Sequence, residues 1–325
     1  MQMLLAGDIG GTKTLLRIAQ KTEQGLVTFC EQRYASGDYM TFDHMLGSFL
    51  SSVTALLGKL PQLTAACLGI AGPVNDRQSQ LTNLGWTLDC DRLAKQLNIE
   101  DLSKVSLIND FAAVGYGVLG LQPEDLYTLQ SGQVKARSPI AIIGAGTGLG
   151  EAFLSWQGDR YEVYATEGGH TNYSPRNALE IELLQYLLER HDRVSVERVV
   201  SGTGIVAIYQ FLCDKYNLAK ELEASAIADA ALNNTDPLAV QAMQIFVESY
   251  AAEAGNLALK LIPNGGLYIA GGIAPKILPL LEDGKFLNIL KSKGRVSPVL
   301  ADMPVHIVLN PEVGLIGAML YGASL

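Results

Sequence analysis

Basic residues are scarce in this chain and closely spaced cysteines are lacking. Each of these facts excludes some classes of function. Lys and Arg total 24 of 325 residues, against 33 Asp and Glu, for a net charge of −9. Binding to nucleic acid or to anionic membranes needs clustered Lys and Arg, and no such run is present. The four cysteines form no C-x-x-C pair, which is typical of a reduced compartment and argues against a cysteine zinc site. We therefore expect a cytosolic protein that binds neither nucleic acid nor membranes.

Long apolar runs, targeting signals and a P-loop are lacking as well. The apolar stretch near 238–262 is broken by Glu248, Glu253 and Lys260, so we expect no membrane span. The N-terminus passes from Met1 straight into a strand-like run, and we expect no signal peptide. No Gly-Lys pair is followed by Ser or Thr, so the chain has no P-loop.

The sequence does contain the same pattern of strands twice. Residues 3–19 predict a strand, a Gly-Gly-Thr turn and a second strand, and residues 25–34 a third strand. Residues 139–156 and 160–166 repeat this order around a second Gly-Thr turn. Dinucleotide-binding folds instead continue from the glycine loop into a helix. We predict an α/β fold of two lobes with duplicated mixed β-sheets around a cleft.

Hydrophobic periodicity predicts the remaining elements. Helices are expected at 39–59, 90–98, 178–190 and 237–262, from Pro275 onward, and at 312–323. Buried strands are expected at 64–72, 104–108, 265–272 and 305–309. The expected domains are a small lobe, residues 1–119 with 311–325, and a large lobe, residues 120–310.

Glycine-rich turns are the first candidate site. In "GDIGGTK" (7–13), backbone N–H groups can approach an anion because no Cβ intervenes, and Asp8 could hold Mg²⁺ through water. On this motif alone an ordinary hairpin is the better explanation, but "GAGTGLG" (144–150) has four glycines, more than a hairpin requires. Two such turns suggest a phosphate chain held from both sides, with "SGTGI" and "YIAGGIAP" as further backbone surfaces. The nucleotide-binding candidates are Gly7, Asp8, Ile9, Gly10, Gly11, Thr12, Gly146, Thr147, Gly148, Gly202, Gly271 and Gly272.

A set of amides, carboxylates and one imidazole forms the second candidate site. "VSLINDFAAV" places two polar residues at the end of a buried run, and we expect Asp110 to begin a helix at Phe111. "QLTNLGW", "TEGGH" and "SVERVVSG" supply the other members. Such groups suit a ligand made of hydroxyls, although a helix cap, a first-turn acid and a loop histidine are the structural alternatives. The candidates are Asn83, Asn109, Asp110, Glu167, His170 and Glu197.

The order of these motifs resembles that of bacterial glucokinases of the non-zinc type. DIGGTK, G-I-A-G-P, T-N-x-x-W, I-N-D-F, G-A-G-T-G-L-G, E-G-G-H, E-R-V-x-S-G and I-A-G-G-I follow one another from residue 7 to about 320. The resemblance implies an actin-like, hexokinase-type (ribonuclease H-like) ATPase fold that phosphorylates D-glucose at its 6-hydroxyl with ATP and Mg²⁺. It further implies Asp110 as general base, the other five candidates as sugar ligands, and a homodimer formed through the large lobe.

Several alternatives stay open. Zinc-containing kinases and repressors match less well, because "HTNYSPRN" after E-G-G-H has no cysteine and the chain starts at the first strand. A kinase of another hexose or of an N-acetylhexosamine is the nearest rival. An actin-fold ATPase and a sugar-sensing regulator are rivals from other classes, and polyphosphate or ADP could replace ATP as donor.

Overall fold

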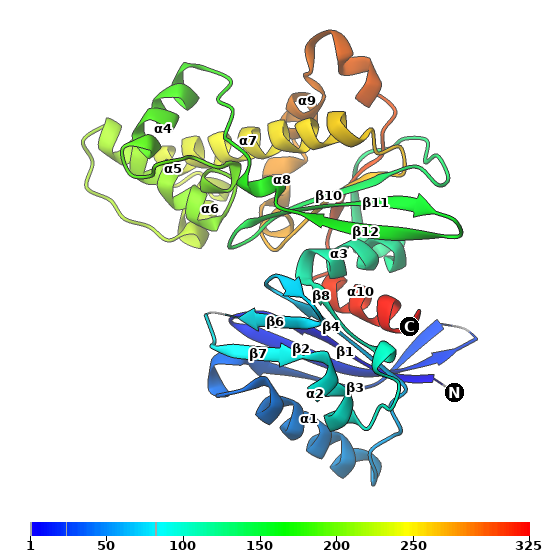
Figure 1. Cartoon of the computed structure of the whole chain (residues 1–325). Coiled ribbons are helices and arrows are strands. Elements are labelled where there is room, and N and C mark those ends of the chain that lie inside the picture. Colours follow the sequence, from blue (N-terminus) through cyan, green and yellow to red (C-terminus); the bar gives the residue numbers. More distant parts are fainter. Residues whose placement is uncertain (1, 24, 82) are drawn as a thin grey trace. The chain divides into compact units, whose positions relative to one another are not determined.

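The chain folds into two units, which are described separately (Figure 1). The computed structural model describes residues 2–23, 25–81 and 83–325. Unit 1 extends to Gln122 and regains the C-terminal segment Glu312–Leu325, and unit 2 is Pro123–Pro311. The α/β class with mixed sheets that the sequence predicts is confirmed in both units.

Unit 1 contains a five-stranded sheet in the order β3-β2-β1-β4-β8. Its strands are β1 (Gln2–Ile9), β2 (Lys13–Thr22), β3 (Gly25–Ala35), β4 (Ala65–Ile70) and β8 (Val105–Asn109). β1 pairs antiparallel with β2, whereas β1, β4 and β8 are parallel, so their carboxyl ends meet at one edge. A separate small sheet, which the sequence patterns do not predict, has the strands β5 (Val74–Asn75), β6 (Gln78–Leu81) and β7 (Trp86–Asp89).

Helices cover both faces of the unit 1 sheet (Figure 1). They are α1 (Phe42–Leu57), α2 (Cys90–Leu97), α3 (Asp110–Gly117) and α10 (Val313–Gly322). Successive strand residues point to opposite faces, so Leu5 packs in the core beside Phe49 of α1, and Leu4 packs beside Leu315 of α10. The three-residue 3₁₀ turns of this unit are η1 (Ser36–Asp38), η2 (Leu102–Lys104) and η3 (Val118–Gly120).

Unit 2 repeats the same sheet order. Its sheet runs β12-β11-β10-β13-β14-β9, where β10 to β12 are an antiparallel series and β13 and β14 continue from β10 in parallel. The strands are β9 (Leu126–Gln130), β10 (Ile140–Ala145), β11 (Leu149–Gln157), β12 (Arg160–Thr166), β13 (Leu267–Ala270) and β14 (Val305–Val308). β9, which the sequence patterns miss, is an added antiparallel edge.

The core of unit 2 is organised by α7 (Pro237–Leu261), which Asp236 caps and Pro237 begins as the sequence predicts. The hydroxyl of Tyr250, in the middle of α7, accepts a hydrogen bond from the backbone N–H of Ala145 at 3.2 Å and thereby ties the helix to β10. The other helices are α4 (Ala178–Leu188), α5 (Gly202–Lys215), α6 (Ala224–Leu232), α8 (Leu278–Leu281) and α9 (Lys285–Lys291). The 3₁₀ segments are η4 (Pro123–Asp125), η5 (Gly168–His170), η6 (Val196–Arg198), η7 (Ala274–Ile277) and η8 (Gly294–Leu300). In the described part of the chain, no helix combines the length and the apolar character that crossing a membrane requires.

Two glycines allow α3 and α10 to touch backbone to backbone. A Cβ added to Gly317 would collide with the carbonyl oxygen of Ala113, and one added to Gly117 would collide with that of Val313. The first turn of α10 in turn reaches Asp8, because a Cβ on Gly314 would lie 3.7 Å from its carboxylate. This packing therefore positions the start of α10 beside the end of β1.

Replacing Gly317 by Ala is expected to destabilise the protein by about 1–3 kcal/mol or more, because the new methyl group overlaps a backbone atom that cannot rotate away. Urea unfolding measures the change. Gly47→Ala in α1 is the matched control, since nothing lies within 4 Å of its added Cβ. It is expected to stabilise by roughly 0.5–1 kcal/mol through helix propensity. Equal effects of the two substitutions would contradict the assigned contact.

Candidate active site

Asn109 and Asp110, the polar pair at the end of β8, have different structural roles. Oδ1 of Asn109 accepts hydrogen bonds from the backbone N–H groups of Phe111 (2.9 Å) and Ala112 (3.2 Å), so Asn109 is the N-cap of α3. The expectation that Asp110 begins a helix at Phe111 is wrong by one residue, because α3 already includes Asp110 as its first residue. The amide oxygen of Asn109 makes the cap, and the Nδ2 of the same residue donates to the carbonyl of Gly72 at 3.4 Å.

Asp110 carries a carboxyl group whose pKa is raised to about 6. Burial is the main cause and the nearby Asp8 carboxylate adds to it, while the backbone N–H of Phe111, 2.8 Å from Oδ1, lowers the pKa. Burial also raises the pKa of Asp8 above its ordinary value, although Lys13 acts in the opposite direction. The two carboxyls therefore lie close enough to interact, at the carboxyl ends of β1 and β8.

The first glycine turn is fixed by a residue that the sequence did not single out. Ser36, fully buried after β3, donates through its hydroxyl to the carbonyl of Gly10 (2.7 Å), and its backbone N–H donates to Thr12 (3.0 Å). Asn83 lies directly over Gly11, where an added Cβ would meet its amide group. Unit 1 thus brings Asn83 onto the turn between β1 and β2.

The three remaining glycine segments meet at one place in unit 2. The backbone N–H of Gly202, the first residue of α5, donates to the carbonyl of Gly146 at 2.8 Å. Gly271, at φ +82°, packs against the carbonyl of Ala145 so closely that no Cβ fits. The turn 146–148, the start of α5 and the segment after β13 therefore form a single backbone surface around the end of β10.

Glu197 contacts this surface as well. Its Oε2 accepts a hydrogen bond from the backbone N–H of Leu149 at 2.9 Å and lies against Gly148, where it fills the place of a Cβ. One oxygen of the Glu197 carboxylate therefore holds the glycine turn. Oε1 has no protein partner among the described residues and is available to a ligand.

Glu167 precedes the turn η5, His170 is its last residue, and their side chains point to each other. Nε2 of His170 lies 3.8 Å from Oε2 of Glu167, and both side chains are exposed, at 53% and 88% respectively. The segment that follows pairs with the one before Glu197, because the N–H of Val196 donates to the carbonyl of Thr171 at 2.9 Å. Unit 2 therefore brings Glu167, His170 and Glu197 together on adjoining segments.

Behind these residues lies Glu151 of β11, which sequence analysis missed. Its side chain is 2% exposed, and its Oε2 packs against the Cα of Gly168. Burial, with help from Glu253, raises the pKa of Glu151 to about 7. The available signal was a carboxylate at an inward-facing position of the strand that follows G-A-G-T-G-L-G.

The described residues contain neither a metal-binding cluster nor a disulfide. Within the described ranges, no group of three or more His, Cys, Asp or Glu side chains is arranged to hold a metal ion. Cys30, Cys67, Cys90 and Cys213 are free thiols.

Comparisons with known proteins agree on one family. The family model described as Glucokinase matches residues 5–324. Curated glucokinases from Trichormus variabilis and Synechocystis are 51% and 48% identical over 100% and 98% of both chains. Among solved structures, a glucokinase from an Antarctic psychrotroph has a TM-score of 0.88 at 29% identity, covering 100% of both chains. A glucokinase from Balamuthia mandrillaris in complex with glucose has a TM-score of 0.82 at 25% identity, covering 100% of this chain and 94% of that one.

A more distant structure shares the fold. A glucokinase of the ROK family from Streptomyces griseus, in complex with glucose and AMPPNP, has a TM-score of 0.62 at 20% identity, covering 97% of each chain. The matching family model and the curated relatives extend over the segments that carry both glycine turns and all six polar candidates. The chain therefore belongs to the glucokinase family, whose members phosphorylate glucose with ATP.

Proposed function

We propose that this chain transfers the γ-phosphoryl group of ATP to the 6-hydroxyl of D-glucose with Asp110 as the general base. In this proposal, units 1 and 2 are the two lobes of an actin-like sugar kinase, which the duplicated sheet order supports. The observation that carries the assignment is the carboxyl group of Asp110, partly buried at the start of α3 with a pKa of about 6.

Asp110 has the properties that a base for a sugar hydroxyl needs. A hydroxyl is a poor nucleophile until its proton leaves, and a carboxylate can accept that proton as the oxygen attacks phosphorus. With a pKa of about 6, the group is ionised at neutral pH and is a stronger base than an exposed aspartate. Asn109 holds the first turn of α3 and so fixes the direction of its neighbour.

The exposed acid and imidazole groups of unit 2 are assigned to the sugar. Glu167, His170 and the second carboxylate oxygen of Glu197 offer donors and acceptors that the protein does not use itself. In unit 1, Asn83 and the remaining amide hydrogen of Asn109 are assigned to further hydroxyls. The Balamuthia mandrillaris relative, whose structure contains glucose, supports a sugar of this kind.

The glycine turns are assigned to the nucleotide, with one refinement. The N–H groups of Gly10, Gly146 and Gly202 already donate within the protein. We therefore assign phosphate binding to the neighbouring amides, those of Gly11, Thr12, Thr147 and Gly148. Gly7 and Ile9 are buried within β1, so they shape the site and contact the nucleotide only through backbone atoms.

Magnesium fits the residues at the end of β1. Mg²⁺ prefers carboxylate oxygens and retains water, and the buried Asp8 carboxylate beside Asp110 offers such a site. The raised pKa values of both groups are the effect expected of paired acids that a cation would stabilise in their ionised form. When bound, the ion would neutralise phosphate charge. Homodimer formation and a cytosolic location stay predictions.

Asp110→Asn is expected to lower kcat by about 10²–10⁴-fold, the usual range for general-base assistance, and to change the affinity for glucose only a few-fold. A coupled ADP assay and glucose titration calorimetry measure the two quantities. Asp89→Asn is the matched control, because Asp89 also begins a helix of unit 1 and asparagine retains its capping bond. Near-normal turnover in Asp110→Asn would refute the base assignment.

The pKa of Asp110 makes activity depend on pH. Because only the ionised form accepts a proton, kcat/KM is expected to fall about tenfold per pH unit below pH 6 and to level off above it. The raised pKa also means that ionisation destabilises the folded protein. The free energy of unfolding of Asp110→Asn, measured in urea relative to that of the wild type, should therefore increase as pH rises from about 4 to 6 and then remain constant. An acid limb centred near pH 4 would contradict the assignment.

Substrate selectivity tests the sugar ligands and the rival substrates together. If separate polar groups hold separate hydroxyls, inverting or removing one hydroxyl should lower kcat/KM by up to about 10⁴-fold, because the group that held it is left without a partner. The measurement compares glucose, mannose, fructose and N-acetylglucosamine in the ADP assay, with sugar-free ATP hydrolysis as the control. Equal use of all four sugars, or ADP release independent of sugar, would exclude the proposed site.

A further inference from the structure

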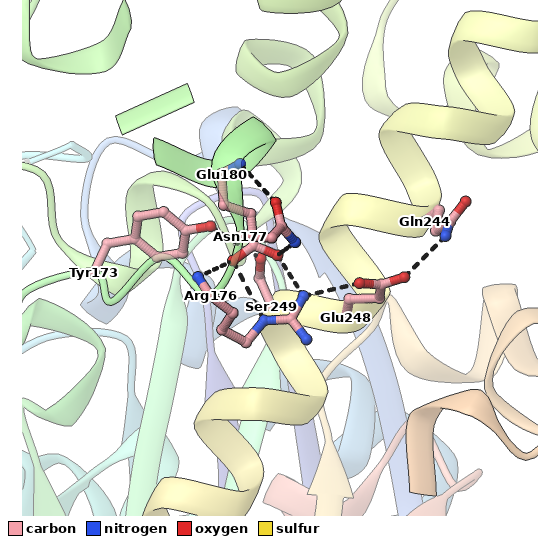
Figure 2. Close-up of polar contacts among 7 residues, drawn as sticks. All are labelled: Tyr173, Arg176, Asn177, Glu180, Gln244, Glu248 and Ser249. Carbon is pink, nitrogen blue, oxygen red and sulfur yellow. Dashed lines mark hydrogen bonds and ion pairs between the residues drawn. The ribbon is translucent and has the colours of Figure 1, made fainter. Parts of the chain in front are cut away.

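A network of polar side chains begins three residues after His170, and its Tyr173, Glu180 and Ser249 are buried. We call it the Tyr173 network. It connects the chain just after His170 with the start of α4 and the middle of α7 (Figure 2). Its members are Tyr173, Arg176, Asn177, Glu180, Gln244, Glu248 and Ser249.

The carboxylate of Glu180, 1% exposed, is the centre of the network. It accepts hydrogen bonds from the backbone N–H of Arg176 (2.7 Å), from the Arg176 guanidinium and from Nδ2 of Asn177 (3.2 Å). Asn177 caps α4 by accepting from the N–H of Glu180 at 3.0 Å. The cap itself does not require Arg176, whose bonds to Glu180 therefore add to it.

Arg176 extends the network to α7. Its Nη2 donates to Glu248 at 2.9 Å as well as to Glu180, and Glu248 in turn accepts from Gln244. Burial alone would lower the pKa of Arg176, but these two carboxylates raise it above its ordinary value. The guanidinium therefore joins the start of α4 to the long helix through charged groups that would be costly to separate.

Tyr173 joins this network to the sugar segments. Its ring is 7% exposed, and its hydroxyl lies 3.3 Å from Oγ of Ser249 and also bonds to Glu180. Burial, together with Glu180, raises the pKa of the phenol, so the hydroxyl stays protonated as a donor. Its backbone N–H donates to Val194 at 3.1 Å, beside the bridge between Asn172 and Ser195.

The segments that carry Glu167, His170 and Glu197 are built on short turns. Glu167 caps and His170 ends a three-residue 3₁₀ turn, η5, and Glu197 lies within another, η6. Turns of this length have poor hydrogen-bond geometry and do not hold a side chain in one direction unaided. The bridge, neighbouring backbone bonds and the Arg193 guanidinium, which donates to the carbonyl of His170 and to Oδ1 of Asn172, link the two segments to each other. Tyr173 anchors the first segment in the core, as Val194 and Val196 anchor the second.

We propose that Tyr173 is a positioning residue for glucose, which anchors the segments bearing Glu167, His170 and Glu197 to α7 through Ser249 and Glu180. The proposal rests on the sugar-ligand roles given above. It assigns the network to ground-state binding of the sugar, because the segments that the network supports carry the proposed sugar ligands and not the proposed base.

Tyr173→Phe tests the proposal because it removes one hydroxyl and retains the ring. We expect the glucose KM to rise about 3- to 10-fold, the equivalent of one neutral hydrogen bond, with kcat and the ATP KM within about twofold of wild type. Ser249→Ala should shift the glucose KM in the same direction from the α7 side. Tyr209→Phe is the matched control, since this buried tyrosine of the same unit donates to Asp236 at 2.8 Å, away from the sugar segments.

Three outcomes would overturn the positioning role. They are an unchanged glucose KM in Tyr173→Phe, an equal rise in Tyr209→Phe, and a parallel rise in the ATP KM. His170→Ala, measured beside them, separates the two levels of the argument. If it raises the glucose KM while Tyr173→Phe does not, only the positioning role fails. If His170→Ala has no effect, the sugar-ligand assignment fails and the positioning role with it.

Discussion

The contact between α3 and α10 is the constraint on which the site in unit 1 depends. Gly117 and Gly317 leave room for two helix backbones but for no side chain between them. α3 begins with Asp110, and α10 begins beside the carboxylate of Asp8. The surroundings of both acids are thus determined by backbone atoms, which have no alternative rotamers, so the electrostatic environment of Asp110 is a property of the fold.

Three carboxyl groups that lie inside this protein differ in how many hydrogen-bond donors surround them. Glu180 is fully paired with donors and contributes to structure. Asp110 is only partly paired, and burial leaves it with a pKa of about 6, which suits proton transfer. Glu151, with one buried oxygen that lacks a partner among the described residues, has a pKa of about 7 and lies behind Gly168. The carboxylate with the most hydrogen-bond donors is thus the structural one, and the two with fewer donors have raised pKa values.

Local features of the chain could be predicted from the sequence, and long-range contacts could not. The glycine turns at 10–12 and 146–148 follow from residues that sit within the turns themselves. Which of Asn109 and Asp110 caps α3 could not be decided, because both residue types are good caps. The contact between Ser36 and Gly10 joins residues 26 apart, and no local pattern signals it. The strands β5 to β7 have two to four residues each, too few for a period to be recognised.

The bond from Leu149 to Glu197 links two parts of unit 2 that bind different substrates in the proposed function. One carboxylate oxygen supports the glycine turn, and the other is available to a sugar hydroxyl. A sugar that orders this side chain also orders the turn, which then loses less entropy when a phosphate group binds. Because such linkage is reciprocal, the nucleotide must favour the sugar by the same free energy as the sugar favours the nucleotide. In the proposed function, a single glutamate thus makes the two binding equilibria interdependent.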